Sequence, residues 1–201
     1  MNKFKLCFDV ETTGLLQIGK KKQPAITQIG ALIIAPNGKI VNKFNEKMNP
    51  FTLDRGFLLS DEALKITNTS IDELHSYPSQ KKIFKKFQLF LGEYVDPYAR
   101  GDNYTPIGYN SSRFDEQMLQ MWFKDNKAVY GGFIGYKGFD VYELVKLFLI
   151  NKWDFHKLPN HQLSTIAKHL SINIDAHDAL SDIEATWEIY KTLKKRLKDG
   201  V

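Results

Sequence analysis

An alternating pattern opens the chain at residues 3–15, which read KFKLCFDVETTGL. Every second residue from Phe4 to Val10 is apolar, a period of two that predicts a β-strand whose successive side chains point to opposite faces. Asp9 and Glu11 therefore share a face, about 6.6 Å apart along the strand, and their carboxylates repel each other. A divalent cation such as Mg²⁺, which prefers hard oxygen ligands, would relieve this repulsion. The following turn, Thr12-Thr13-Gly14, would place hydroxyl and backbone N–H groups beside that cation.

Length and composition predict a single domain over residues 1–201. Hydrophobic residues make up 43% and charged residues 25%, which are ordinary globular values. The net charge of +5 suits a polyanionic partner such as nucleic acid without requiring one. The single cysteine, Cys7, excludes an internal disulfide and a cysteine-based zinc site, and we expect it to be a small buried residue. Neither a signal-peptide pattern nor a membrane-length apolar run is found, so we expect a cytoplasmic protein with no membrane partner.

The remaining pattern predicts an α/β fold. Two strands at Ile26–Ala35 and Lys39–Met48, separated by a Pro-Asn-Gly turn, should form an antiparallel meander with the first strand. Capping residues and apolar periodicity then predict helices beginning near Ser60, Ser70 and Pro78, followed by a strand at Thr105–Tyr109 and a flexible aromatic loop at Lys127–Gly138. Further helices are expected at Phe139–Ile150 and Leu163–Leu170, and a closing helix has Asp182 in its first turns.

The chain has two lysine-rich stretches, and the simpler interpretation of each is a surface exposed to solvent. The loop Gln17–Gln23 carries Lys20, Lys21 and Lys22 and is either a solvated turn or a phosphate contact. The helix after Pro78 has a lysine face that we expect to be solvated; it consists of Lys81, Lys82, Lys85 and Lys86.

Further carboxylates downstream change the interpretation of the first pair. On its own, Asp-x-Glu is more often a solvated feature of an edge strand, because charged side chains are mostly exposed. Asp115 falls at a strand end that runs into a helix, and Asp182 falls in the first turns of the closing helix. His177 lies in the loop before that helix. Each of these signals is weak alone.

Three boxes in a fixed order carry a family resemblance. They are Asp9-x-Glu11-Thr12-Thr13-Gly14, Asn110-x3-Phe114-Asp115 and His177-x-Ala179-x2-Asp182. Together they resemble the boxes of the DEDD exonucleases, in the histidine-containing DEDDh subgroup, which includes polymerase proofreading subunits and the nuclease domain of bacterial exonuclease I. The chain departs from many of these proteins at Thr67 and Tyr109, where a histidine is common, and the departures bear on polymer preference more than on activity.

The resemblance implies a ribonuclease H-like fold, in which a mixed five-stranded sheet, an antiparallel meander followed by parallel strands, is flanked by helices. It also implies a metal-dependent 3′–5′ exonuclease with two Mg²⁺ ions, for which Mn²⁺ can substitute. Asp9 would bridge the ions, Glu11 and Asp182 would complete one site, and Asp115 would complete the other. His177 would be the general base, because a histidine pKa of about 6.5 suits proton transfer near neutral pH. The residues expected to bind the terminal nucleotide are Thr12, Thr13, Gly14, Leu15 and Asn110.

The favoured partner is the 3′ end of single-stranded DNA, hydrolysed to 5′-nucleoside monophosphates, and a polymerase is a compatible second partner. RNA or short oligoribonucleotides are the alternative substrates, since no residue can be assigned to a 2′-hydroxyl contact. A non-catalytic module that binds a polymerase or a nucleic-acid end is the alternative from another class. The complete set of four carboxylates and a histidine argues against it, because a binding module has no need of mutually repelling acids.

Overall fold

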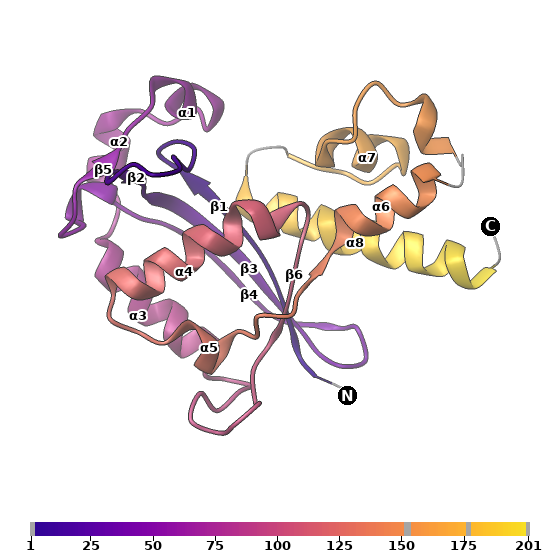
Figure 1. Cartoon of the computed structure of the whole chain (residues 1–201), viewed down its shortest axis with the longest axis horizontal. Coiled ribbons are helices and arrows are strands. Elements are labelled where there is room, and N and C mark those ends of the chain that lie inside the picture. The colour runs from indigo at the N-terminus through magenta and orange to yellow at the C-terminus, as the bar shows by residue number, and fades with distance from the viewer. Residues whose placement is uncertain (1–2, 151–153, 176–177, 200–201) are drawn as a thin grey trace.

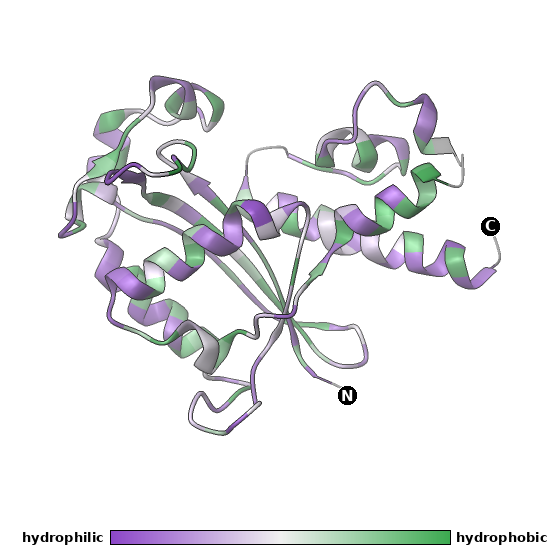
Figure 2. Ribbon diagram, viewed as in Figure 1, coloured by the Kyte–Doolittle hydropathy of each residue, from purple (hydrophilic) through white to green (hydrophobic). Residues whose placement is uncertain are grey.

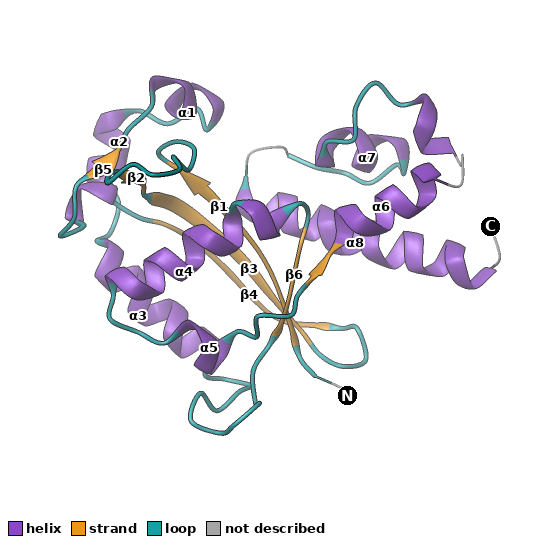
Figure 3. Cartoon of the chain, viewed as in Figure 1, coloured by secondary structure: helices purple, strands orange, loops and turns teal. Residues whose placement is uncertain are grey.

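The computed structural model describes residues 3–150, 154–175 and 178–199, and its centre is a five-stranded mixed sheet (Figures 1 and 3). The strand order is β4-β3-β1-β6-β7. β3 is antiparallel to both β1 and β4, whereas β6 is parallel to both β1 and β7. The strands are β1 (Lys5–Thr12), β3 (Ile26–Ile34), β4 (Ile40–Lys47), β6 (Thr105–Gly108) and β7 (Phe139–Asp140). The predicted meander and mixed sheet are confirmed.

Helices cover both faces of this sheet (Figure 1). One face packs against α3, α4 and α5, and the other packs against α6, α7 and α8. The helices are α1 (Asp61–Ile66), α2 (Ile71–Ser76), α3 (Gln80–Leu91), α4 (Asp115–Asp125), α5 (Tyr130–Phe133), α6 (Val141–Ile150), α7 (Leu163–His169) and α8 (Ala179–Asp199). A small separate sheet pairs β2 (Gln23–Pro24) with β5 (Phe57–Leu58).

The two long inner strands, β1 and β3, are mostly apolar because both of their faces are covered (Figure 2). All nine residues of β3 are buried. On β1, Leu6 and Phe8 enter the hydrophobic cluster under α3 and α4, while Cys7 enters the cluster under α8, as its expected burial required. By strand alternation, Asp9 and Glu11 point to the same side as Cys7. The first strand thus directs its carboxylates toward α8.

Two local expectations are corrected, and one strand pair was not predicted. The stretch Lys127–Gly138, expected to be a flexible loop, contains α5, because Tyr130 is buried and its ring lies 5.4 Å from that of Phe123. The helix expected over Phe139–Ile150 begins at Val141, because the two residues before it pair with β6 as β7. The β2–β5 pair was not predicted, since two-residue strands carry no periodicity. Within the described ranges, no helix is long and apolar enough to cross a membrane.

Candidate active site

Three carboxylates meet at the end of β1. Asp9, Glu11 and Asp182 each place one oxygen within 4.8 Å of the oxygens of the other two. All three side chains are partly buried. The two β1 residues come from alternate positions of one strand, and Asp182 comes from the first turn of α8. The structure therefore brings together three residues that were predicted to hold metal.

A glycine allows α8 to approach the sheet closely enough for this. Gly30 on β3 is the register partner of Asp9, and the backbone of Ala179 occupies the space that a side chain on Gly30 would need. Ala179 is itself fully buried. This contact sets the height of the first turn of α8 above the sheet and hence the position of Asp182.

A buried glutamine fixes the same turn from the side. The Gln28 side-chain amide donates to Asn45 on β4 at 2.9 Å and to the Asp178 carboxylate at 3.0 Å. That carboxylate also accepts the backbone N–H of Ser181 at 3.0 Å. Asp178 thus links β3 to the start of α8, and Gln28 is a positioning residue for which the sequence analysis had no role.

Asp115 approaches the cluster from the opposite side of β1. It is the first residue of α4, is 8% exposed, and its Oδ1 accepts the backbone N–H of Val10 at 3.4 Å. Because Val10 separates the two β1 acids, this bond brings the fourth carboxylate to their strand. Asp115 is not one of the three residues whose carboxylate oxygens all lie within 4.8 Å of one another.

Burial and mutual repulsion disfavour ionisation of these acids. The pKa of Asp9 is raised well above its ordinary value, first by burial and then by the charges of Asp115, Glu11 and Asp182. The pKa of Glu11 rises to about 7, by burial and then by Asp182. The pKa of Asp115 also rises to about 7 by burial, although hydrogen bonds from two backbone N–H groups partly oppose the rise. Within the described residues, none of the charges that shift these pKa values is positive.

The cluster fits a divalent metal. Its donors are carboxylate oxygens only, which hard cations such as Mg²⁺ and Mn²⁺ prefer, and they lie close enough together to share one ion. A cation would also supply the positive charge that these acids lack. Asp9, Glu11 and Asp182 would hold it, with Asp115 available to a neighbouring ion.

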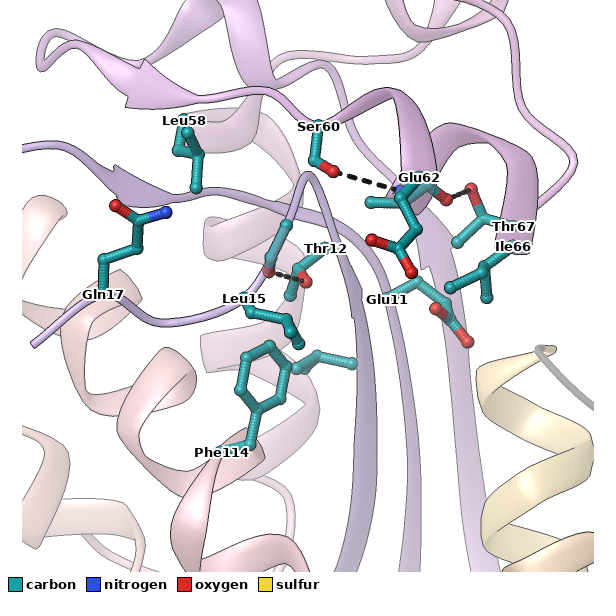
Figure 4. Close-up of a pocket in the computed structure, with 13 residues that line it drawn as sticks. Glu11, Thr12, Leu15, Gln17, Leu58, Ser60, Glu62, Ile66, Thr67 and Phe114 are labelled. Atoms are coloured by element: carbon teal, nitrogen blue, oxygen red, sulfur yellow. Dashed lines mark hydrogen bonds between the residues drawn. The ribbon is translucent and has the colours of Figure 1, made fainter.

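A cavity of about 460 Å³ adjoins the cluster (Figure 4). Its floor is the end of β1, including Glu11 and Thr12, and helix α1 covers it from above. The apolar side chains of Leu15 and Phe114 contribute to its wall. Leu15 is 75% exposed, so its apolar side chain is accessible to a ligand in the cavity. The full lining is Val10, Glu11, Thr12, Gly14, Leu15, Gln17, Leu58, Ser60, Glu62, Ala63, Ile66, Thr67 and Phe114.

The predicted nucleotide-binding residues separate into three groups. Thr12, Gly14 and Leu15 line the cavity, where the Thr12 hydroxyl donates to the Gly14 carbonyl at 2.8 Å. Thr13 does not line it; its hydroxyl donates to the Leu58 carbonyl and accepts the Ala25 N–H, so it ties the turn to the small sheet. Asn110 lies at a different cavity. Its backbone N–H donates to Asp140, and its backbone is left-handed with φ of 56°.

His177 lies outside the described residues. The α1 side of the cavity, in contrast, is fully described and was not predicted. Ser60 looked only like a helix cap, and its hydroxyl does accept the Ala63 N–H at 3.4 Å (Figure 4). Glu62 adds a further carboxylate to the lining. Phe114 belongs to the second sequence box and directly precedes Asp115, a predicted metal ligand. That position in the sequence could have indicated its place in the wall of the cavity.

A mixed sheet with helices on both faces and acids at the end of its central strand defines a ribonuclease H-like nuclease. The chain belongs to the Exonuclease (RNase_T) family, whose model matches residues 6–190. This places it among the DEDD-type 3′–5′ exonucleases, a divalent-metal-dependent class, and confirms the family predicted from the three boxes.

Similar proteins include bacterial DNA polymerases III of the PolC type. The chain is 29% identical over 196 residues to DNA polymerase III PolC-type from Lacticaseibacillus paracasei, and 28% identical over 202 residues to DNA polymerase III PolC-type from Bacillus cereus. These matches cover 94% and 96% of this chain but 11% of each relative, so the chain spans about a tenth of their length.

Solved structures of Escherichia coli exonuclease I share the fold. Its zinc-bound complex with single-stranded DNA superposes with a TM-score of 0.78 at 18% identity, covering 98% of this chain and 42% of that one. An apo exonuclease I structure gives a TM-score of 0.76 at 18% identity, covering 99% of this chain and 43% of that one. The predicted ribonuclease H-like architecture is confirmed by this likeness.

Proposed function

We propose that this chain hydrolyses the terminal phosphodiester bond at the 3′ end of single-stranded DNA and releases 5′-nucleoside monophosphates. The observation that carries the proposal is the cluster of Asp9, Glu11 and Asp182 beside a cavity that has both apolar and polar lining residues. Membership of the Exonuclease family supports the reaction type. The fold shared with exonuclease I, which has been solved in complex with single-stranded DNA, supports the polymer.

The four carboxylates are proposed to hold two Mg²⁺ ions, with Mn²⁺ as a substitute. Two such ions would neutralise the phosphate, polarise the attacking water and stabilise the leaving oxygen. Asp9, Glu11 and Asp182 bind from one side and Asp115 from the other. Because the Asp115 carboxylate is held by the Val10 N–H, its position relative to β1 is fixed before substrate arrives.

The cavity is proposed to hold the terminal nucleotide. Its volume of about 460 Å³ lies in the range of small-ligand sites and suits one nucleotide better than a duplex end. Leu15 and Phe114 would pack against the base, and the polar groups of Thr12 and Ser60 would face the sugar. Such packing is tolerant of base identity, as a non-specific exonuclease requires.

His177 is proposed as the general base that takes the proton of the attacking water. This assignment comes from the third sequence box. It is supported by its neighbour Asp178, which is tied to β3 by Gln28 at the edge of the acidic cluster. An imidazole is half-protonated near pH 6.5 and can accept a proton at neutral pH.

A proofreading context beside a DNA polymerase is proposed as the setting of this activity. The similarity to a segment of PolC-type polymerase III supports it. Co-purification with a polymerase, and a lower mutation rate in its presence, would be the expected results. Equal misincorporation by that polymerase with and without the chain would exclude this setting while leaving the hydrolysis intact.

The test of the reaction is digestion of single-stranded DNA and RNA 20-mers of matched sequence, labelled at either end. We expect Mg²⁺-dependent shortening from the 3′ end, faster for DNA, with 5′-deoxynucleotides as products and none in excess chelator. The test variant is Asp182→Asn, which removes one acid of the cluster and should be inactive. Its matched control is Asp72→Asn on the exposed surface of α2, which should keep full activity.

Three outcomes would contradict the proposal. Faster digestion of RNA would reassign the substrate to RNA. Binding of the 20-mer without cleavage under any divalent metal would identify a non-catalytic module. Full nuclease activity of Asp182→Asn would exclude a role of the acidic cluster in the reaction.

A further inference from the structure

A basic surface lies at the end of the sheet opposite the acidic cluster. β3 runs antiparallel to β1, so its end at Ile34 pairs with Lys5, and the turn that follows lies away from Glu11. Lysines of α8 face this turn and form, with it, a cavity of about 330 Å³. We call this surface the α8 lysine patch; its lining is Asn37, Gly38, Trp187, Tyr190, Lys191, Lys194, Lys195 and Lys198.

The positive charge of this patch is not neutralised by its surroundings. No acidic residue lines the cavity. Lys191 pairs with Glu188 at 2.6 Å, but Lys195 and Lys198 take part in none of the ion pairs of the described chain. Lys5 adds further charge from β1, and its pKa is lowered by burial and by the charge of Lys194. Cations held this close without acids match a polyanion.

Aromatic rings support the lysines from below. The Tyr190 ring stacks on Trp187 with centroids 5.0 Å apart and meets Phe139 at 5.6 Å. The Lys194 ammonium lies 5.4 Å above the Tyr190 ring. Only 3% of Trp187 is exposed, so this stack is anchored in the hydrophobic core and holds the surface in a fixed shape. Aromatic rings among lysines are typical of single-strand binding surfaces.

The lysine face of α3 differs from this patch. Lys86 pairs with Glu46 at 2.6 Å, and Lys81 lines a cavity that also contains Asp54 and Asp125. Lys82 and Lys85 are exposed, one turn apart on the same helix. They have the same spacing as Lys195 and Lys198, without a basic cavity, and so provide a matched control.

We propose that the α8 lysine patch binds the sugar–phosphate backbone of the same strand whose 3′ end enters the active site. The inference rests on the proposed function. Both sites are on one helix: thirteen residues of α8 separate Asp182 from Lys195, about 20 Å at 1.5 Å per residue. At the rise of about 3.4 Å per nucleotide of a stacked strand, this distance corresponds to roughly six nucleotides, and a more extended strand would cover it with fewer. The patch therefore adds affinity for long strands and none for very short ones.

The experiment compares binding of a fluorescent dT20 and a fluorescent dT3 by anisotropy, in chelator so that no cleavage occurs. For Lys195→Ala with Lys198→Ala, we expect roughly tenfold weaker binding of dT20 at low salt and unchanged binding of dT3. The slope of log affinity against log salt should become shallower by about 1.4, which corresponds to two lost contacts with single-stranded phosphates. Lys82→Ala with Lys85→Ala should behave as the unmodified protein.

Cleavage of both oligonucleotides in Mg²⁺ distinguishes the two proposals. If the unmodified protein cleaves neither, the proposed function fails. If it cleaves both, and the two double variants bind dT20 equally, only the lysine patch proposal is overturned. Equal weakening of dT3 and dT20 would also overturn it, because a contact that acts on the shortest strand belongs to the active site.

Discussion

Gly30 lies directly beneath Ala179: a β-carbon built on Gly30 would come 2.5 Å from the Ala179 carbonyl carbon and 2.7 Å from the next backbone nitrogen. These obstacles are backbone atoms, so no side-chain rotation can relieve the clash. The close approach places Asp182 against Asp9, the register partner of Gly30. The site therefore depends on a residue that bears no reactive group.

Gly30→Ala should lift the first turn of α8 and open the acidic cluster. We expect a loss of about 1–3 kcal/mol in the free energy of unfolding, typical of overpacking, and a larger proportional loss of nuclease activity. Gly56→Ala is the control, because its β-carbon would meet only the end of the Lys22 side chain at 3.6 Å. Denaturant unfolding and digestion of a labelled oligonucleotide measure both effects. Unchanged activity in Gly30→Ala would show that α8 need not be so close.

The stability of the metal-free protein should fall as the pH rises. Glu11 has a folded-state pKa of about 7, raised by burial, whereas in the unfolded chain its pKa is close to the ordinary value near 4.5. The folded state therefore binds the proton more tightly, and the resulting stability is complete below pH 4.5 and lost as the pH passes 7. In chelator, Glu11→Gln should be more stable than the unmodified protein at pH 8, and this advantage should shrink toward pH 5.

Glu62→Gln is the control for that experiment, since Glu62 is an exposed acid of the same cavity. Melting temperatures between pH 5 and 8 provide the measurement. A difference between Glu11→Gln and the unmodified protein that stays constant across this range would contradict the raised pKa of Glu11.

Divalent metal should stabilise the protein most at high pH. Binding to the folded state alone adds about 2.7 kcal/mol at a metal concentration one hundred times the dissociation constant. Protons compete for the same carboxylates, so the rise in melting temperature with Mg²⁺ or Mn²⁺ should be larger at pH 8 than at pH 5.5. Asp182→Asn should lose most of the rise. An equal rise in that variant would locate metal binding elsewhere.

Leu15→Ala should weaken substrate binding without affecting the fold. Leu15 is 75% exposed in the free protein and lines the cavity, so its apolar surface is buried only when substrate packs on it. Removing it should raise KM about tenfold, from a loss of roughly 1.5 kcal/mol, with little change in kcat. Ile18→Ala is the control, because Ile18 is fully exposed and does not line the cavity. Equal kinetics of the two variants would exclude Leu15 from the nucleotide site.

His177→Ala should slow the chemical step by about a hundredfold or more while KM is largely kept. Added imidazole should restore part of the rate, a result that a structural role would not give. His75→Ala, which alters an exposed histidine stacked on Phe51, is the control. An unchanged single-turnover rate in His177→Ala would exclude it as the base.

Sequence reasoning predicted the parts of the fold that have a strong period. The alternation around Asp9 correctly predicted β1 and the shared face of its acids, and the apolar run after Ile26 correctly predicted β3. The two-residue strand β7 was missed because its pairing with β6 depends on a distant segment. From local sequence preference alone, the predicted helix included these two residues, which precede α6.

The acidic cluster was predictable only because three boxes occur in a known order. Nothing near Asp115 in the sequence indicates that its carboxylate meets the Val10 N–H, because that contact requires β6 to lie beside β1. The α1 wall of the cavity was not predictable for the same reason. Ser60 caps its helix in the ordinary way, and its place above β1 is set by the Thr13 carbonyl, which accepts the Ser60 N–H at 2.8 Å.

The origin of the acids in distant segments also governs when a growing polypeptide becomes competent. Asp9 and Glu11 leave the ribosome early, whereas Asp182 is translated long afterwards and reaches them only once β3 has paired and α8 has docked on Gly30. Bringing such remote segments together costs loop-closure entropy before their contacts stabilise the fold. A polypeptide in which α8 has not yet docked consequently carries two repelling acids but no complete cation cage, and we expect it to leave the nucleic acids around it intact.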